Sequence, residues 1–373
     1  MSLNKIVYRN KLKKSLIKII KGLYHFPAKY WRKSLWNKIK MTIIIIIILV
    51  IGTMYSIAQW YIASQQSIPL KLGVSFSPSY AKSLGLNPQR TMKALLSIGI
   101  KQFRINSYWS SMEPQPNVYN FSTLDWEFKY AEQAHAKIIL VLGLRQPRWP
   151  ECHMPTWATH EPQSKWQPQL ENFIKAVVNR YKNSSSLESY QLENEYFLKG
   201  FGTCTNFSRS RLISEYHLVR KLDPHHTVII DRSNNAIGFP VGKPTPQEFG
   251  ISIYKRVWDA NITHRYLEYP FPAWYYAFLA GVQKIFLHRN MIITEMQAEA
   301  WTPDGKTIPQ TSLTEQNKSF NAQRFKNRFS FAKATGMRDI IMWGGEYWYY
   351  RKVVLHDPTV WNIAKEEYKG SLG

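Results

Sequence analysis

Acidic residues are missing from the first 40 positions of this 373-residue chain, which contain twelve Lys and Arg and no Asp or Glu. That segment carries half of the formal net charge of +24. Because an apolar stretch follows it directly, its charge favours contact with anionic lipid headgroups over contact with nucleic acid. The other half of the charge is spread along the chain without a dense cluster. Such a spread is typical of a solvated basic surface, and a preference for acidic glycans is the alternative.

Motifs for metals and nucleotides are missing as well. The ten His are scattered, and no set of His, Cys and Asp has the spacing of metal ligands. The first strand-like run is followed by Ser-Pro-Ser-Tyr at 77–80 instead of a glycine-rich loop, so the chain has no dinucleotide fingerprint. We therefore expect no cofactor, no metal and no nucleic-acid partner.

A long uncharged stretch occupies residues 42–63, with Trp60 and Tyr61 near its end. As a helix it would span about 33 Å, which is enough for the hydrocarbon core of a bilayer. The basic arm, residues 1–41, predicts a cytoplasmic N-terminus, and the aromatic pair suits the opposite interface. A cleaved signal peptide is the alternative, but the leader is long and lacks the small residue that cleavage requires. We expect a single-pass anchor in the cell membrane, with the C-terminal domain extracytoplasmic.

After a linker at 64–69, strand-like and helix-like patterns alternate through one domain, residues 70–373. Short apolar runs occur at 71–77, 101–106, 137–144, 188–194, 226–232, 250–255, 290–296 and 338–344. Helical patterns occur near 88–98, 122–136, 164–182, 208–222, 272–287, 314–335 and 359–368, and the crossover at 233–249 is weak. This alternation predicts parallel strands with right-handed crossovers. Eight units in about 300 residues favour a closed (β/α)8 barrel, whose active site lies at the C-terminal ends of its strands.

Two glutamates follow strand-like runs that would lie across the barrel mouth from each other. Glu195 follows the fourth run and Glu295 ends the seventh. Cleavage of a glycosidic bond needs such a pair: an acid that protonates the leaving oxygen and a carboxylate that meets the anomeric carbon. One of the two must stay protonated near neutral pH, which requires burial or a like-charged neighbour.

Around these glutamates, residues 70–368 resemble the large clan of retaining glycoside hydrolases with (β/α)8 barrels, which includes the cellulase and β-galactosidase families. The clan has an Asn-Glu pair after the fourth strand and a Glu nucleophile at the seventh, and Asn194-Glu195 and Glu295 match these positions. The second, sixth and eighth strand positions are matched by Arg104, Tyr254 and Trp343. The resemblance implies a retaining glycosidase acting on an oligo- or polysaccharide, with Glu195 as acid/base and Glu295 as nucleophile.

The other matched residues have physical roles in this hypothesis. Asn194 would hydrogen-bond the sugar 2-hydroxyl, and Arg104 and Tyr254 would keep Glu295 ionised and oriented. Trp343 would provide a flat apolar floor for a sugar ring. The alternatives are a structural ion pair for Arg104 and core packing for the two aromatic residues.

Several features leave room for other interpretations. The cellulase-like family carries His after strands three and six, where this chain has Gln146 and Ser252. Glu299 and Glu346 are carboxylates near the expected pair, and we expect Glu113 to brace its loop. A glycan-binding barrel without catalysis, an enzyme that transfers sugar to another sugar, and a barrel with unrelated chemistry remain as rivals.

The chain has only two cysteines, Cys152 and Cys204, which follow the third and fourth strand-like runs. Adjacent barrel loops on an oxidised outer face would bring them within bridging distance. We expect one disulfide, and two buried free thiols are the alternative.

Overall fold

The computed structural model describes residues 34–198, 200–204, 206–233 and 242–370. Most of the basic arm, and residues 234–241 of the weak crossover expected at 233–249, lie outside the described residues. The chain divides into two compact units, Met1–Ile57 and Ala58–Gly373.

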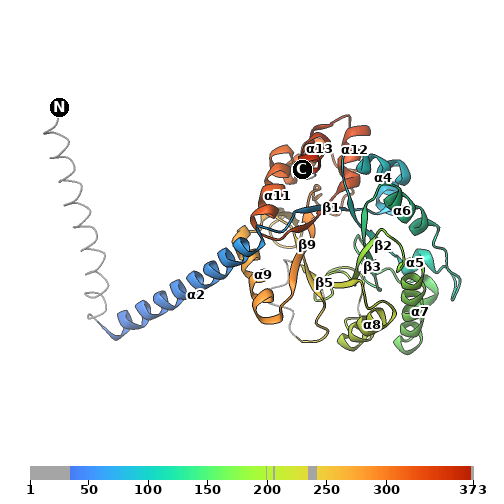
Figure 1. Ribbon diagram of the computed structural model, residues 1–373. Helices are drawn as coiled ribbons and strands as arrows, with labels where there is room; N and C mark the ends of the chain where they lie inside the picture. The colour runs from blue at the N-terminus through green and yellow to red at the C-terminus, as the bar shows by residue number, and fades with distance from the viewer. Residues whose placement is uncertain (1–33, 199, 205, 234–241, 371–373) are drawn as a thin grey trace. The chain divides into compact units, whose positions relative to one another are not determined.

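Eight parallel strands of the second unit close into a barrel in the order β1-β10-β9-β6-β5-β4-β3-β2 (Figure 1). Their bounds are Lys71–Ser75 (β1), Gln102–Asn106 (β2), Lys137–Leu142 (β3), Leu187–Leu192 (β4), Thr227–Ser233 (β5), Glu248–Ile253 (β6), Asn290–Gln297 (β9) and Asp339–Trp343 (β10). Each expected strand-like run corresponds to one of these strands, so the predicted (β/α)8 fold is confirmed. The runs are recognisable because parallel barrel strands are buried on both faces and are therefore almost continuously apolar.

Helices surround the barrel, and each segment expected to be helical after residue 70 contains helix (Figure 1). The crossover helices are Pro88–Ser97 (α4), Ser122–Gln133 (α6), Gln163–Tyr181 (α7), Arg209–Leu222 (α8), Ala273–Leu287 (α9), Leu313–Ser319 (α10), Ala322–Ala334 (α11) and Thr359–Gly370 (α13). Short segments that the sequence patterns did not predict are Pro78–Ser83 (α3), Trp109–Met112 (α5), Thr156–Ala158 (η1), Gly345–Val353 (α12) and an antiparallel hairpin of Arg256–Asp259 (β7) and Arg265–Glu268 (β8).

The single helix expected at 314–335 is two helices, α10 and α11. The backbone of Phe320 is extended, and the side chain of Asn321 accepts a hydrogen bond from the Arg324 amide at 3.0 Å. Asn321 therefore caps a new helix instead of continuing the old one. The two helices pack on different elements: α10 contacts β7 of the hairpin, whereas α11 contacts the barrel strand β9.

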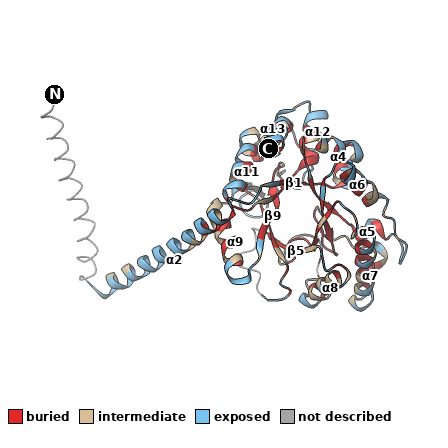
Figure 2. Ribbon diagram, in the orientation of Figure 1, coloured by how far each residue is buried: buried red, intermediate tan, exposed pale blue. Residues whose placement is uncertain are grey.

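Two hydrophobic clusters support the fold. The larger lies between the strands and the inward faces of the helices, and the outward faces are exposed (Figure 2). The smaller consists of four buried isoleucines inside the barrel: Ile139, Ile229, Ile292 and Ile341. They fill the barrel beneath the mouth, as branched side chains do in this fold. The site is thus built on a packed floor.

Glycines in two strands make room for inward side chains. A Cβ on Gly73 would lie 2.6 Å from Ile341, and one on Gly250 would lie 2.5 Å from Asp231 and 2.6 Å from Thr294. Gly250 is paired in register with Asp231, which lies on the neighbouring strand β5. The absence of a side chain at position 250 therefore leaves space for a buried carboxylate at the barrel mouth.

Helix α2, Leu35–Gln65, contains the uncharged stretch expected at 42–63. By length and composition it is long and apolar enough to cross a membrane, and it is largely exposed (Figure 2). Its last turns belong to the barrel unit, in which Ala58 and Tyr61 are buried. The folded unit thus begins before the expected linker at 64–69.

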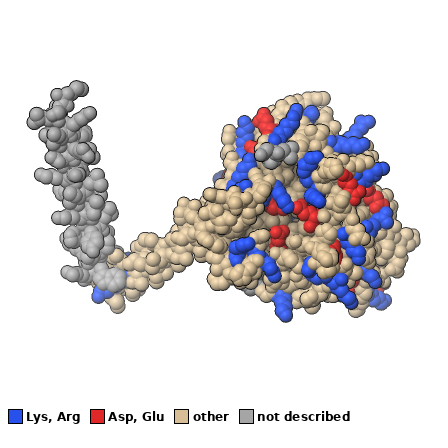
Figure 3. All heavy atoms as spheres, viewed as in Figure 1, with Lys and Arg blue, Asp and Glu red and all other residues tan. Residues whose placement is uncertain are grey.

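On the face of the barrel unit that Figure 3 shows, the Lys and Arg side chains are scattered, with acidic groups among them. This distribution agrees with the dispersed positive charge seen in the sequence.

Candidate active site

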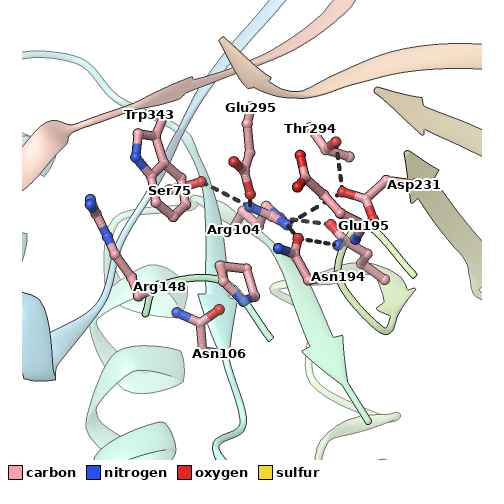
Figure 4. Close-up of polar contacts among 12 residues, drawn as sticks. Ser75, Arg104, Asn106, Arg148, Asn194, Glu195, Asp231, Thr294, Glu295 and Trp343 are labelled. Atoms are coloured by element: carbon pink, nitrogen blue, oxygen red, sulfur yellow. Dashed lines mark hydrogen bonds and ion pairs between the residues drawn. The ribbon is translucent and has the colours of Figure 1, made fainter. Parts of the chain in front are cut away.

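Arg104, on β2, lies at the centre of a buried polar network below the barrel mouth (Figure 4). Its guanidinium donates to Glu295, Asn194 and Gln191, each at 2.7 Å. Asp231 lies 3.6 Å away. Arg has a planar fork of donors, so it can orient several acceptors at once. One residue thus connects strands β2, β4, β5 and β9.

Glu295, on β9, is held at both carboxylate oxygens. Arg104 donates to Oε1 at 2.7 Å, and the Tyr254 hydroxyl, just after β6, donates to Oε2 at 2.6 Å. Burial and the nearby charge of Glu295 hold the pKa of Tyr254 well above its ordinary value, so the phenol stays protonated. The two donors fix the orientation of the Glu295 carboxyl group at the barrel mouth.

Glu195 has a different environment. Its φ is +43°, and its amide donates to Asp231 Oδ1 at 2.8 Å, so a left-handed turn aims the side chain into the mouth. Among the described residues, its buried Oε1 has no hydrogen-bond partner. Burial, and then the charges of Glu295, Glu151 and Asp231, raise the pKa of Glu195 well above its ordinary value. Burial among acids thus favours the protonated form of Glu195, whereas Glu295 accepts two hydrogen bonds, one of them from a guanidinium.

Glu193, two residues earlier, has a structural role. Its carboxylate accepts the backbone amides of Leu144 at 2.8 Å and Arg145 at 2.9 Å. Arg211, on α8, donates to it at 2.6 Å. These bonds tie the loop after β3 to the end of β4. Of the two glutamates in Glu193-Asn194-Glu195, only Glu195 faces the pocket.

Glu151, in the loop after β3, is a pocket residue that the sequence analysis missed. Its carboxylate accepts from Asn194 Nδ2 at 2.8 Å and lies 3.7 Å from Arg145 Nε. Burial, with the charge of Glu295, raises the pKa of Glu151 to about 8. Since Arg104 holds Asn194 Oδ1, the orientation of the Asn194 amide is determined from both sides. No strand-end position marks Glu151 in the sequence, because the loop brings it to the pocket.

Asp231, at the end of β5, was also missed, although an acid in an apolar strand is a recognisable signal. It accepts from the Glu195 amide and from Thr294 Oγ1 at 3.0 Å. Burial raises its pKa to about 6, against the opposing effect of Arg104. Asp231 thus positions the Glu195 turn.

Trp343, the last residue of β10, is not an open floor. The guanidinium of Arg148 lies 3.9 Å from its ring centroid and 3.5 Å from that of Tyr80. Glu299 accepts from Arg148 at 2.5 Å and from Trp343 Nε1 at 2.8 Å. One face of the expected sugar floor is therefore covered by a cation. Only the part of the Trp343 indole that lines the pocket remains available for the predicted stacking on a sugar ring.

The other carboxylates near the pair have structural partners. Glu299 is paired with Arg148, and Glu346 accepts from the Ser77 amide at 2.5 Å and lies 3.7 Å from Arg148. Glu113 accepts from Trp109 Nε1 at 2.6 Å and from the Asn117 amide at 2.7 Å. The expectation that Glu113 braces its loop is confirmed.

A pocket at the barrel mouth contains five of the six expected site residues: Asn194, Glu195, Tyr254, Glu295 and Trp343. Arg104 lies beneath them, 1% exposed. Arg148, Trp149 and Glu151 complete one wall. Within the described ranges, no group of three or more His, Cys, Asp and Glu is arranged to hold a metal ion.

Cys152 and Cys204 form a disulfide with a Cα–Cα distance of 4.9 Å, as predicted. It joins the loops that follow β3 and β4, at the wall that carries Glu151. The bridged residues are 52 positions apart, a separation for which chain entropy gives a stabilisation of about 4 kcal/mol.

Sequence comparison finds relatives for part of the chain, while no family model matches it. Mannan endo-1,4-β-mannosidase A of Podospora anserina is 32% identical over 95 residues, which are 26% of this chain and 24% of that protein. Mannan endo-1,4-β-mannosidase F of Aspergillus clavatus is 26% identical over 117 residues, 30% of this chain and 26% of that protein. The matched region thus spans about a quarter of the length of these curated relatives.

Solved structures share the fold at low sequence identity. An exo-β-1,4-mannosidase from Opitutaceae bacterium strain TAV5 has a TM-score of 0.51 and 10% identity, over 82% of this chain and 60% of that one. A xylanase from Cellvibrio japonicus has a TM-score of 0.50 and 14% identity, over 74% and 58%. Together with the related segment, these likenesses confirm the resemblance to the clan of (β/α)8 retaining glycoside hydrolases.

Proposed function

We propose that this protein is a membrane-anchored retaining glycoside hydrolase in which Glu195 is the acid/base and Glu295 the nucleophile. The observation that carries the proposal is the contrast between the two carboxyls. Burial near other acids raises the pKa of Glu195 well above its ordinary value, whereas Arg104 and Tyr254 donate hydrogen bonds to the two oxygens of Glu295. Acid-assisted displacement requires one carboxyl that gives a proton and one that attacks, and these two environments suit those roles.

In the first step a Glu295 oxygen forms a bond to the anomeric carbon while the glycosidic C–O bond breaks. The Glu195 proton passes to the departing oxygen. Glu295 loses its charge as the ester forms, and Glu195 acquires one. The negative charge therefore moves across the mouth without leaving it, so the buried network does not gain net charge.

In the second step the Glu195 carboxylate takes a proton from water, whose oxygen attacks the anomeric carbon. The ester bond breaks, Glu295 becomes a carboxylate again, and Glu195 is reprotonated. Arg104 and Tyr254 stabilise the returning charge on Glu295. Asn194, held by Arg104 and Glu151, can present its remaining N–H to a sugar hydroxyl.

For the substrate we propose a β-1,4-linked mannan or manno-oligosaccharide. Support comes from the names of the partial relatives, which are mannan endo-1,4-β-mannosidases, and from a structural neighbour that is an exo-β-1,4-mannosidase. The test is hydrolysis of manno-oligosaccharides, xylo-oligosaccharides and β-galactosides by the full-length chain in detergent. Proton NMR should show that the first product retains the β configuration. Inverted product, or no hydrolysis of any of them, would refute the proposal.

We further propose that residues 42–63 cross the membrane with the basic arm, residues 1–41, on the cytoplasmic side against anionic lipids. The length and composition of α2 and the positive charge before it support this topology. The barrel would then face the cell exterior. External protease on intact cells should digest the region after residue 65 and spare a tag placed before Met41. Protection of the barrel would refute the orientation, and release of a soluble domain would refute the anchor.

A further inference from the structure

Trp149 is exposed in a way that fold stability does not explain. Its side chain is 68% exposed, whereas the other tryptophans described in the 71–373 region are buried or half-buried. It lines the same pocket as Glu195 and Glu295. Since leaving a large aromatic ring in water forgoes the free energy of burying it, an exposed ring beside a pocket suggests a ligand contact.

The backbone that carries Trp149 is held on both sides. The Glu151 amide donates to the Arg148 carbonyl at 2.8 Å, and the Gln146 amide donates to the Glu151 carbonyl at 2.9 Å. Arg148 is itself fixed by Glu299. The turn therefore presents the indole from a rigid support, and little conformational entropy remains to be lost when a ligand binds.

A second aromatic ring comes from the neighbouring loop. The half-buried Phe201 lies 6.1 Å from Trp149, centroid to centroid, with an interplanar angle of 70°. The disulfide joins the two loops three residues beyond each ring, at Cys152 and Cys204. The Thr203 amide donates to the Pro150 carbonyl at 3.0 Å. Both rings are thus clamped together as one surface, which we call the rim platform.

The rim platform is carried by the two loops that bring Glu151 and Glu195 to the pocket. Phe201 belongs to the loop after β4 that carries Glu195, and Trp149 belongs to the adjacent loop that carries Glu151. In acid-assisted cleavage the group beyond the scissile oxygen is next to the acid. A pyranose has an apolar C–H face that packs on an aromatic ring while its hydroxyls stay in water.

We propose that the rim platform, Trp149 with Phe201, is a binding subsite for the leaving-group sugar, a neutral pyranose ring. The proposal rests on the glycosidase function inferred above and adds the place where the leaving-group sugar ring binds. It also assigns the disulfide a role in substrate binding, because the bridge fixes the spacing of the two loops.

The kinetic test compares two substrates of one sugar with the full-length protein in detergent: a manno-oligosaccharide, whose leaving group is a ring, and the glycosyl fluoride, whose leaving group has none. Trp149→Ala should lower kcat/KM for the oligosaccharide about tenfold or more beyond its effect on the fluoride. Phe286→Ala is the matched control, because this 73% exposed ring lies near the end of α9, at the opposite end of the barrel. Equal losses on both substrates would overturn the proposal.

A binding test separates this proposal from the proposed function. Trp149 oxidation by N-bromosuccinimide is measured by mass spectrometry on Glu295→Ala protein, with and without the manno-oligosaccharide. Protection of Trp149 supports the platform even if the wild-type protein hydrolyses nothing, in which case only the function fails. Hydrolysis by the wild type without protection overturns the platform alone. Neither protection nor hydrolysis overturns both.

The role of the disulfide is tested with the Cys152→Ser/Cys204→Ser protein. If the bridge positions the rim platform, this variant should lose kcat/KM on the oligosaccharide more than on the fluoride, through a higher KM. A uniform loss on both substrates would mean that the bridge serves only stability, and would overturn this part of the proposal.

Discussion

At the residue scale, the two catalytic candidates differ in what surrounds them rather than in their chemistry. Both are glutamates, yet Glu295 has two strong donors and Glu195 has acidic neighbours. Substitution should therefore affect different steps. The Glu295→Ala protein should lose activity on every glycoside by at least about a thousandfold, because no other group forms the ester.

The Glu195→Ala protein should keep the first step for substrates with very good leaving groups, which need no proton. Its second step should be rescued by azide, which attacks without a general base, and should yield a β-glycosyl azide from a β-glycoside. The Glu366→Ala protein, changed on the exposed face of α13, should match the wild type. Equal loss in both variants on activated substrates, without azide rescue, would contradict the assignment and direct attention to Glu299 or Glu346.

Glu151 provides a second test at this scale. Its charge is one of the causes that raise the pKa of Glu195. The Glu151→Gln protein keeps an oxygen that can accept from Asn194 but loses the acid, so the pKa of Glu195 should fall. The basic limb of the pH profile of kcat/KM should then move to lower pH, because the general acid loses its proton earlier. An unchanged basic limb would show that the two carboxyls do not interact.

At the scale of elements, glycine in a strand leaves space for a site residue on the neighbouring strand. Gly250, on β6, faces Asp231, on β5, whose carboxylate holds the Glu195 amide. Ala at position 250 would press on Asp231 and Thr294. We expect Gly250→Ala to destabilise the fold by about 1–3 kcal/mol and to lower activity.

The control for this change is Gly370→Ala, because a Cβ at the end of α13 meets no described atom within 4 Å. Its stability should equal or slightly exceed that of the wild type. Urea unfolding of both proteins measures the difference. A Gly250→Ala protein with wild-type stability and activity would show that the barrel relaxes at no cost.

At the scale of the whole molecule, buried carboxyls make stability depend on pH. Burial raises the pKa of Asp231 to about 6, of Asp339 and Glu346 to about 7, and of Glu151 to about 8. The folded state therefore binds these protons more tightly than the unfolded chain does. The stability that they contribute is complete below about pH 4 and is lost as the pH rises through 6 to 8.

Burial lowers the pKa of His153 to about 4, and this shift has the opposite effect on stability. The contribution of His153 to the free energy of unfolding rises with pH up to about 6.5. The decline in stability that the buried carboxyls cause should therefore be clearest between pH 6.5 and 8. We expect the urea midpoint to fall across this range, and the free energy of unfolding to fall by at least about 1 kcal/mol. Asp339→Asn, away from the pocket at the start of β10, should make the dependence shallower. A midpoint that rises from pH 6.5 to 8 would contradict the expectation.

The sequence by itself determined the architecture. Strands that are buried on both faces have unbroken apolar runs, and the outer helices have a 3.6-residue apolar period. These patterns were enough to predict the eight units and the strand-end positions of Glu195 and Glu295. Only the tertiary structure decided which side chains contact one another at the site. Asp231 and Glu151 reach the pocket from β5 and a loop, and Arg148 covers the ring of Trp343. These contacts join residues far apart in the chain, and the protonation of Glu195 depends on the burial and charge that they create.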